Sequence, residues 1–195
     1  RFAHALVRQT LEDELSTLRR VHLHRDLAHA IEGRFGAPDS AVAELAHHFA
    51  EAAVAGEGER AAHYAERAAT QALDRGAPEQ AIELFERALD LLPAEADPDG
   101  LLRERLYLQL EHCCWGAADT QRLETVTRRH LKLAGEVDDL VMRWWAVGWF
   151  VCSFVSRAVP GPEDLAELTS ILSTDLRDVD VAGRQRFSNQ GSWCP

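Results

Sequence analysis

The segment from Glu59 to Pro93 contains two amphipathic helical patterns separated by a short turn. In the second pattern the apolar residues recur at three- and four-residue steps and share one helix face, namely Ala81, Ile82, Phe85, Ala88, Leu89 and Leu92. Gly76 suits the left-handed turn that ends a helix, and Pro78 suits the first turn of the next. The segment therefore predicts a helix–turn–helix hairpin of about 34 residues, the length of a tetratricopeptide repeat.

A single hairpin of this kind cannot bury its apolar face, so it needs neighbouring hairpins. Small residues line its first helix and allow close helix approach, namely Ala62, Ala65, Ala69 and Ala72. Hydrophobic residues make up 46% of the chain, yet β-branched and aromatic residues are too sparse for a sheet protein. We therefore predict an all-α fold of helical hairpins stacked as a tetratricopeptide-like superhelix.

The sequence also predicts helices in the rest of the chain, separated by turns that contain Gly, Pro or Asp. We expect helices over Phe2–Leu15, Thr17–Glu32 with Ser16 as N-cap, Asp39–Ala55, Leu101–Ala117, Asp119–Ala134, Asp139–Ala158 and Glu163–Leu176. The repeat weakens after residue 100, because Thr127 falls where Phe85 sits and His130 falls where Ala88 sits. The expected domains are residues 1–36, a helical segment; 37–176, the helical repeats; and 177–195, an irregular tail.

The stretch from Trp144 to Val155 is almost entirely apolar. It is shorter than the roughly 20 residues that a membrane helix needs, and Arg143 and Arg157 bracket it. This length favours a buried helix between repeat layers over a membrane contact.

Charge restricts the possible partners. The formal net charge is −11, from 32 acidic and 21 basic residues. Nucleic acid and anionic lipid both require concentrated positive charge, so we expect no nucleic-acid partner and no membrane partner. Lys132 is the only lysine, and no Gly-rich phosphate loop is present, so the chain should not bind ATP by itself.

The four cysteines do not form a recognised motif. Cys113 and Cys114 are adjacent, Cys152 and Cys194 are isolated, and no Cys-x-x-Cys pair occurs. Reduced thiols in a cytoplasm fit this pattern best. The chain begins with Arg1 and shows no signal peptide, which indicates an excerpt of a longer cytoplasmic polypeptide.

Nine histidines make a metal site worth testing. His22 and His24 point about 200° apart on a helix, and the adjacent His47 and His48 also diverge. No two histidines are four residues apart, which excludes the helical His-Glu-x-x-His pattern. We predict no metal ligands and interpret these residues as surface or helix-packing histidines.

A self-contained active site is not found in the sequence. His112 precedes Cys113 and Cys114, but neighbouring side chains on one helix point in different directions, so we interpret the cysteines as buried. No serine lies in a Gly-x-Ser-x-Gly elbow. We predict no catalytic residues; an enzyme with an unrecognised site remains an alternative.

Several segments together resemble a known class of bacterial proteins. Residues 1–15, RFAHALVRQTLEDEL, look like the end of the winged-helix part of STAND-type signalling ATPases. The runs STLRRVHLHRDLAHAIE, AELAHHFAEAA, YAERAATQAL and EQAIELFERALDLLP follow in the order seen in that class. The class includes large ATP-binding LuxR-type transcription regulators and related adenylate cyclases, in which an ATPase module leads into a tetratricopeptide-like superhelix.

The resemblance implies a regulatory module that binds a protein partner or small-molecule inducer and biases the state of an upstream ATPase. It also implies that His4, in the setting Phe2-Ala3-His4, contacts the phosphates of ADP held by that ATPase. ATP or ADP would then be a cofactor of the parent chain and not of this segment. The alternative is a stand-alone tetratricopeptide-like adaptor, and a P-loop upstream of Arg1 would discriminate between the two.

Overall fold

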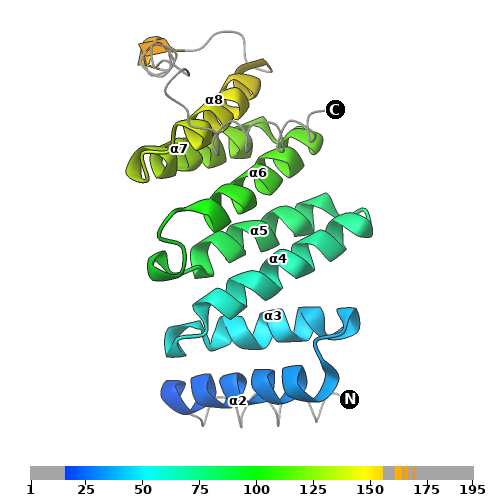
Figure 1. Ribbon diagram of the computed structural model, residues 1–195. Helices are drawn as coiled ribbons and strands as arrows, with labels where there is room; N and C mark the ends of the chain where they lie inside the picture. The colour runs from blue at the N-terminus through cyan, green and yellow to red at the C-terminus, as the bar shows by residue number, and fades with distance from the viewer. Residues whose placement is uncertain (1–15, 156–160, 164, 167–168, 170–195) are drawn as a thin grey trace. The chain divides into compact units, whose positions relative to one another are not determined.

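The computed structural model describes residues 16–155, 161–163, 165–166 and 169, and in this part every regular element is a helix (Figure 1). Successive helices within each part of the chain pack against one another in chain order, which confirms the predicted all-α fold of helical hairpins. The α-helices are α2 (Thr17–Phe35), α3 (Val42–Glu51), α4 (Gly58–Asp74), α5 (Pro78–Leu91), α6 (Leu101–Gly116), α7 (Thr120–Glu136) and α8 (Leu140–Val155).

The chain divides into two compact units, Arg1–Pro98 and Asp99–Pro195. The division falls in the connection between α5 and α6, which contains a short 3-10 turn at Ala94–Ala96. We call the two parts the N-terminal unit and the C-terminal unit. The domain boundaries expected at residues 36 and 176 stay predictions.

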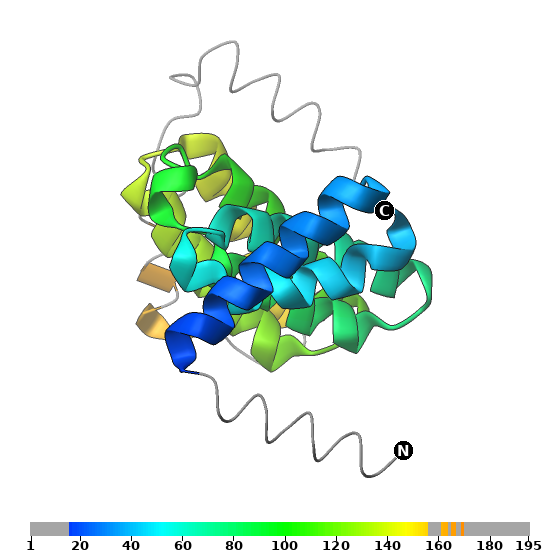
Figure 2. The same ribbon diagram turned by 90° about the horizontal axis from the view of Figure 1, so that it is seen from below.

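In the N-terminal unit, α2 lies beside α3, as both views show (Figures 1 and 2). The Ser16 hydroxyl accepts a hydrogen bond from the Arg19 amide at 3.4 Å, which confirms the predicted N-cap. Gly36, with φ of 64°, ends the helix in the left-handed conformation that glycine adopts without strain.

Only some of the apolar residues of α2 are buried. Val21, Ala28 and Ile31 are buried, whereas the exposed fractions are 68% for Leu18, 49% for Leu23 and 45% for Leu27. In the described part of the chain, α2 packs mainly on α3 and the turn that follows it, so apolar residues on its other sides stay in solvent.

The central hairpin matches its prediction closely. The predicted alanines of α4 are buried, and Ile82 and Phe85 of α5 are 1% and 0% exposed. Gly76 occupies the turn with φ of 72°. At Gly58 the two helices come so close that a Cβ atom would lie 2.7 Å from the Leu91 carbonyl oxygen. Small residues therefore set the spacing of this pair.

The C-terminal unit contains α6, α7 and α8. The Asp119 carboxylate accepts from the Arg122 amide at 3.0 Å and caps α7, and the Asp139 carboxylate accepts from the Met142 amide at 2.9 Å at the start of α8. The helix expected to end at Ala134 continues two residues further, to Glu136, and the chain turns at Asp138, where φ is 51°.

The apolar run of α8 is packed on one side against α7. Ala146, Val147 and Phe150 form a buried cluster with Leu131, and the guanidinium of Arg128 lies 4.7 Å from the centre of the Phe150 ring. Among the described residues, no helix combines the length and apolarity that crossing a bilayer requires. The helices expected at Phe2–Leu15 and, for the most part, at Glu163–Leu176 lie outside the described residues, as do His4 and the tail.

Candidate functional site

A hollow of about 220 Å³ opens on the N-terminal unit between α3, α4 and α5. We call it the alanine groove, because five of its eleven lining residues are alanines from α3 and α4. The lining residues are Ala43, Ala46, His47, Ala65, Ala68, Gln71, Ala72, Arg75, Gln80, Leu84 and Arg87. Since short side chains leave the backbone of two helices close to the surface, the groove can admit a side chain of another molecule.

A short chain of hydrogen bonds positions one of the groove's two arginines. The Gln71 side-chain amide donates to the Asp39 carbonyl oxygen at 3.0 Å, which fixes Gln71 against the 3-10 turn Asp39–Ala41 that precedes α3. The Arg75 guanidinium donates to the Gln71 side-chain oxygen at 3.3 Å. Arg75 is thereby held at the end of α4, beside the turn to α5.

The charge of the groove is opposite to that of the chain as a whole. Its described lining contains Arg75 and Arg87 and no carboxylate, although acidic residues outnumber basic ones in the sequence. Among the described residues, neither Arg75 nor Arg87 forms an ion pair with a carboxylate within 4.0 Å. Both arginines are exposed. Two guanidinium groups with no carboxylate among the described lining residues make this groove a favourable place for a carboxylate.

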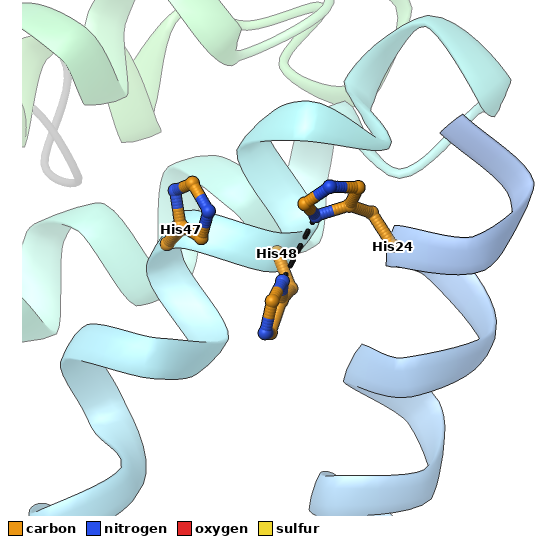
Figure 3. A group of neighbouring side chains, drawn as sticks. All are labelled: His24, His47 and His48. Atoms are coloured by element: carbon orange, nitrogen blue, oxygen red, sulfur yellow. Dashed lines mark hydrogen bonds between the residues drawn. The ribbon is translucent and has the colours of Figure 1, made fainter. Parts of the chain in front are cut away.

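A second feature of the N-terminal unit is a cluster of three histidines, which we call the histidine cluster (Figure 3). His24 comes from α2, and His47 and His48 come from α3; one ring nitrogen from each lies within 4.8 Å of the others. Nδ1 of His24 and Nδ1 of His48 are 2.9 Å apart, so one of them donates a hydrogen bond to the other. The ring centroids are separated by 5.0 to 5.5 Å.

Spacing along a single helix cannot reveal this cluster, because its members come from two helices. The signal that could have found it is the turn: His24 and His48 lie equally far from Gly36, the C-cap of α2. In two antiparallel helices joined by a short connection, residues at equal distances from the turn face one another. His22 and His29 of α2, and the exposed His63 of α4, are not part of the cluster.

Polar contacts fasten α2 to α4 beside the cluster. The Tyr64 hydroxyl donates to the Glu32 carboxylate at 2.6 Å, and the Arg60 guanidinium pairs with the same carboxylate. Burial, followed by the hydrogen bond to Glu32, raises the pKa of Tyr64 to about 12. The ring of Tyr64 stacks on that of Phe49 of α3 with centroids 5.3 Å apart. These contacts make α2, α3 and α4 one packed framework.

The C-terminal unit contains a fully buried polar pair. Nδ1 of His130 lies 3.0 Å from a carboxylate oxygen of Glu111, and both side chains are 0% exposed. Burial raises the pKa of the Glu111 carboxyl, while His130 opposes this shift and Glu104 adds to it. The Tyr107 ring stacks on His130 with centroids 5.1 Å apart. This buried pair joins α6 to α7 and belongs to the packing between them.

The cysteines next to His112 do not form a nucleophile–base pair. Cys113 and Cys114 are buried, whereas His112 is exposed and contacts the edge of Trp149. Burial raises the pKa of the Cys113 thiol to about 11, so the reactive thiolate is disfavoured at neutral pH. The interpretation of these residues as buried helix cysteines is confirmed.

Comparison of the chain with protein-family models, with curated proteins and with solved structures finds no match. The resemblance to signalling ATPases therefore stays a prediction, as does the contact of His4 with ADP.

Proposed function

We propose that this chain is a binding module that captures an acidic segment of a partner protein in the alanine groove. One observation carries the proposal: in a strongly acidic chain, Arg75 and Arg87 flank a groove whose described lining contains no carboxylate. A guanidinium presents several N–H donors in a plane and can bind both oxygens of a carboxylate.

The size of the groove supports a peptide over a larger compact ligand. Sites for drug-sized molecules typically measure about 300–1,000 Å³, and this hollow is smaller, at about 220 Å³. It suits one or two acidic side chains of an extended segment, with the rest of the segment lying across the exposed ends of α3, α4 and α5. An acidic small-molecule inducer would use the same arginines, and the experiment below distinguishes the two.

The test measures binding of a fluorescent peptide of alternating glutamate and alanine, against a peptide with glutamine in place of glutamate. The full chain should bind the glutamate peptide more tightly, and the difference should shrink as salt is raised. Arg75→Gln and Arg87→Gln should each weaken binding about tenfold, the equivalent of one charge-assisted hydrogen bond. Arg19→Gln, an exposed arginine of α2 outside the groove, is the matched control and should not change binding.

A steric variant separates the groove from general charge attraction. Ala43 is exposed and lines the groove, so Ala43→Phe should fill it without disturbing the core or the net charge. Loss of peptide binding in this variant supports the groove. Binding that survives Ala43→Phe and the double arginine variant would refute it, and glutamate monomer competing as well as the peptide would favour a small-molecule inducer.

The wider role that we propose is regulatory. In a cytoplasmic signalling ATPase or transcription regulator, occupation of the groove would bias the state of an upstream ATPase, which is coupling through a two-state element. The second candidate, a stand-alone adaptor, uses the same groove without the ATPase. Reading the codons upstream of Arg1 for Gly-x-x-x-x-Gly-Lys-Ser/Thr distinguishes them, and in the first case His4→Ala should change ADP retention by the intact protein.

A further inference from the structure

The histidine cluster places three imidazole groups, which can bind a metal in their neutral form, at the contact between α2 and α3. Nδ1 of His24 and Nδ1 of His48 face each other at 2.9 Å, and a nitrogen of His47 completes a set within 4.8 Å. When neither Nδ1 carries a proton, two lone pairs point toward the same small region. A cation placed there would replace the proton that the two rings otherwise share.

The spacing is close to that of a tetrahedral ion. Zinc–nitrogen bonds of about 2.0–2.1 Å place tetrahedral ligand nitrogens about 3.4 Å apart. The three ligand nitrogens all lie within 4.8 Å of one another, and the distance between Nδ1 of His24 and Nδ1 of His48, 2.9 Å, is slightly below this value. Small rotations of the side chains would adjust these separations to the required value. His47 is exposed and His24 half-buried, so these rings have room to turn.

The surroundings of His48 favour a bound metal. Its side chain is only 12% exposed, and its second nitrogen, Nε2, lies 4.0 Å from the Glu44 carboxylate one helical turn earlier. A ligating imidazole commonly directs its other N–H to a carboxylate, which fixes the ring and makes it a stronger ligand. A small side-chain movement would bring Glu44 within hydrogen-bond distance for this role when Nδ1 of His48 holds the metal.

We propose that His24, His47 and His48 bind a Zn²⁺ ion that joins α2 to α3. Three imidazoles with no thiolate match the ligand preference of zinc, and the exposed side at His47 leaves a fourth position for water. Because the ligands come from two helices, the ion holds α2 in place at the edge of the N-terminal unit. This site is separate from the proposed peptide function, although His47 also lines the alanine groove.

The experiment titrates the tag-free full chain, stripped with a chelator, with Zn²⁺ against a chromophoric chelator. We expect one zinc ion per chain. Loss of a residue that only orients a metal ligand typically weakens metal affinity about 10–100-fold. His24→Ala, His47→Ala and His48→Ala each remove a ligand, so each should weaken zinc binding by at least this much. His63→Ala removes an exposed histidine of α4 and is the matched control. Glu44→Gln should have a smaller effect than loss of any ligand.

Two further readouts protect the test against variants that fold poorly. Co²⁺ as a probe should give the visible absorption of a tetrahedral site in the wild type and in His63→Ala, and not in His24→Gln, whose half-buried position tolerates the change. Zn²⁺ should also raise the unfolding temperature of the wild type and leave that of His24→Gln unchanged. Absence of zinc binding, or equal binding in His24→Gln, would overturn the site; unchanged zinc affinity in Arg75→Gln/Arg87→Gln would show that it is independent of peptide binding.

Discussion

The turn between α4 and α5 and the turn between α6 and α7 have the same backbone geometry. Gly76 and Ala118, which are 42 residues apart, occupy the left-handed conformation with φ of 72° and 55°. In each turn the next amide donates to a carbonyl five residues earlier at 2.9 Å, the bond of a Schellman motif. The turn before α8 repeats it at Asp138, at 3.2 Å.

The same shift of 42 residues compares the interiors of the two hairpins. The four predicted alanines of α4 correspond to Glu104, Tyr107, Glu111 and Cys114 of α6, and all eight are buried. Ala88 of α5 corresponds to His130 of α7, which is also buried. The N-terminal hairpin thus packs through small apolar residues, and the C-terminal hairpin encloses a hydrogen-bonded polar pair in the corresponding places.

This difference teaches that a hairpin geometry can persist when its side-chain signature does not. Glu111 and His130 share one hydrogen bond and Tyr107 stacks on the imidazole ring, while Oε2 of Glu111 and Nε2 of His130 have no hydrogen-bond partner among the described residues. A search for an apolar pattern detects only packing through small apolar residues, as in α4 and α5. The hairpin of α6 and α7 lacks that pattern but keeps the same backbone turn.

The largest expected effect is on the free energy of unfolding, and it compares Phe85 of α5 with Thr127, the equivalent position of α7. Phe85 is 0% exposed, so Phe85→Ala should lower the unfolding free energy by about 3–5 kcal/mol through lost burial and a cavity. Urea unfolding followed by circular dichroism measures it. A loss below about 1 kcal/mol would show that this position is not part of a tight core.

The control for that variant is Thr127→Ala in the C-terminal unit. Thr127 is also 0% exposed, and its hydroxyl donates to the Glu124 carbonyl oxygen at 3.0 Å. Removing one such hydrogen bond and a methyl group should cost about 1–2 kcal/mol. Equal losses in the two variants would contradict the view that the hairpins are stabilised differently.

Most of the fold follows from local rules that act within one helix or one turn. Ser16, Gly76 and Asp119 mark helix ends correctly because each satisfies backbone groups within a few residues. The exposure of Leu18 does not follow from such rules, because an apolar residue is buried only where a neighbouring helix covers it. That requirement depends on the partner and is absent from the periodicity of α2 itself.

The candidate sites were largely outside the reach of such rules. The alanine groove needs residues from three helices, and the histidine cluster needs two helices in a defined register. The sequence analysis considered all three histidines of the cluster, but it compared spacings within one helix. His24 meets His47 and His48 because the chain reverses direction at Gly36, between α2 and α3. Contacts between helices therefore form both candidate sites, and a helix pattern describes only one side of each contact.

The second prediction tests whether the hydrogen bond between Glu111 and His130 stabilises the C-terminal unit. Glu111→Ala leaves His130 buried without its partner, which should cost about 1–3 kcal/mol. Glu111→Gln keeps the shape and can donate its amide to Nδ1 of His130. It should therefore be much less destabilising, and a loss equal to that of Glu111→Ala would mean that the hydrogen bond contributes nothing.

The third prediction concerns how the stability of the wild type, relative to Glu111→Gln, changes with pH. Because burial raises the pKa of Glu111 in the folded state, with Glu104 adding to the shift and His130 opposing it, the native protein keeps this proton to higher pH than the unfolded chain. The wild type should then lose stability relative to Glu111→Gln as pH rises above the unfolded value of 4.5. Unfolding at a series of pH values measures the difference, and a gap that widens toward acid instead would reverse the assignment.

The smallest effect concerns the shared turn and is tested by exchanging its central residues. Gly76→Ala places a Cβ atom in the left-handed conformation and should cost about 1 kcal/mol, because the strain of about 1–2 kcal/mol is partly offset by a less flexible unfolded chain. Ala118→Gly relieves the same strain and should gain a similar amount. No other heavy atom lies within 4 Å of a Cβ added at Gly76, so packing does not obscure the comparison. Thermal unfolding of both variants should therefore shift in opposite directions, and shifts of the same sign would show that the two turns are not energetically equivalent.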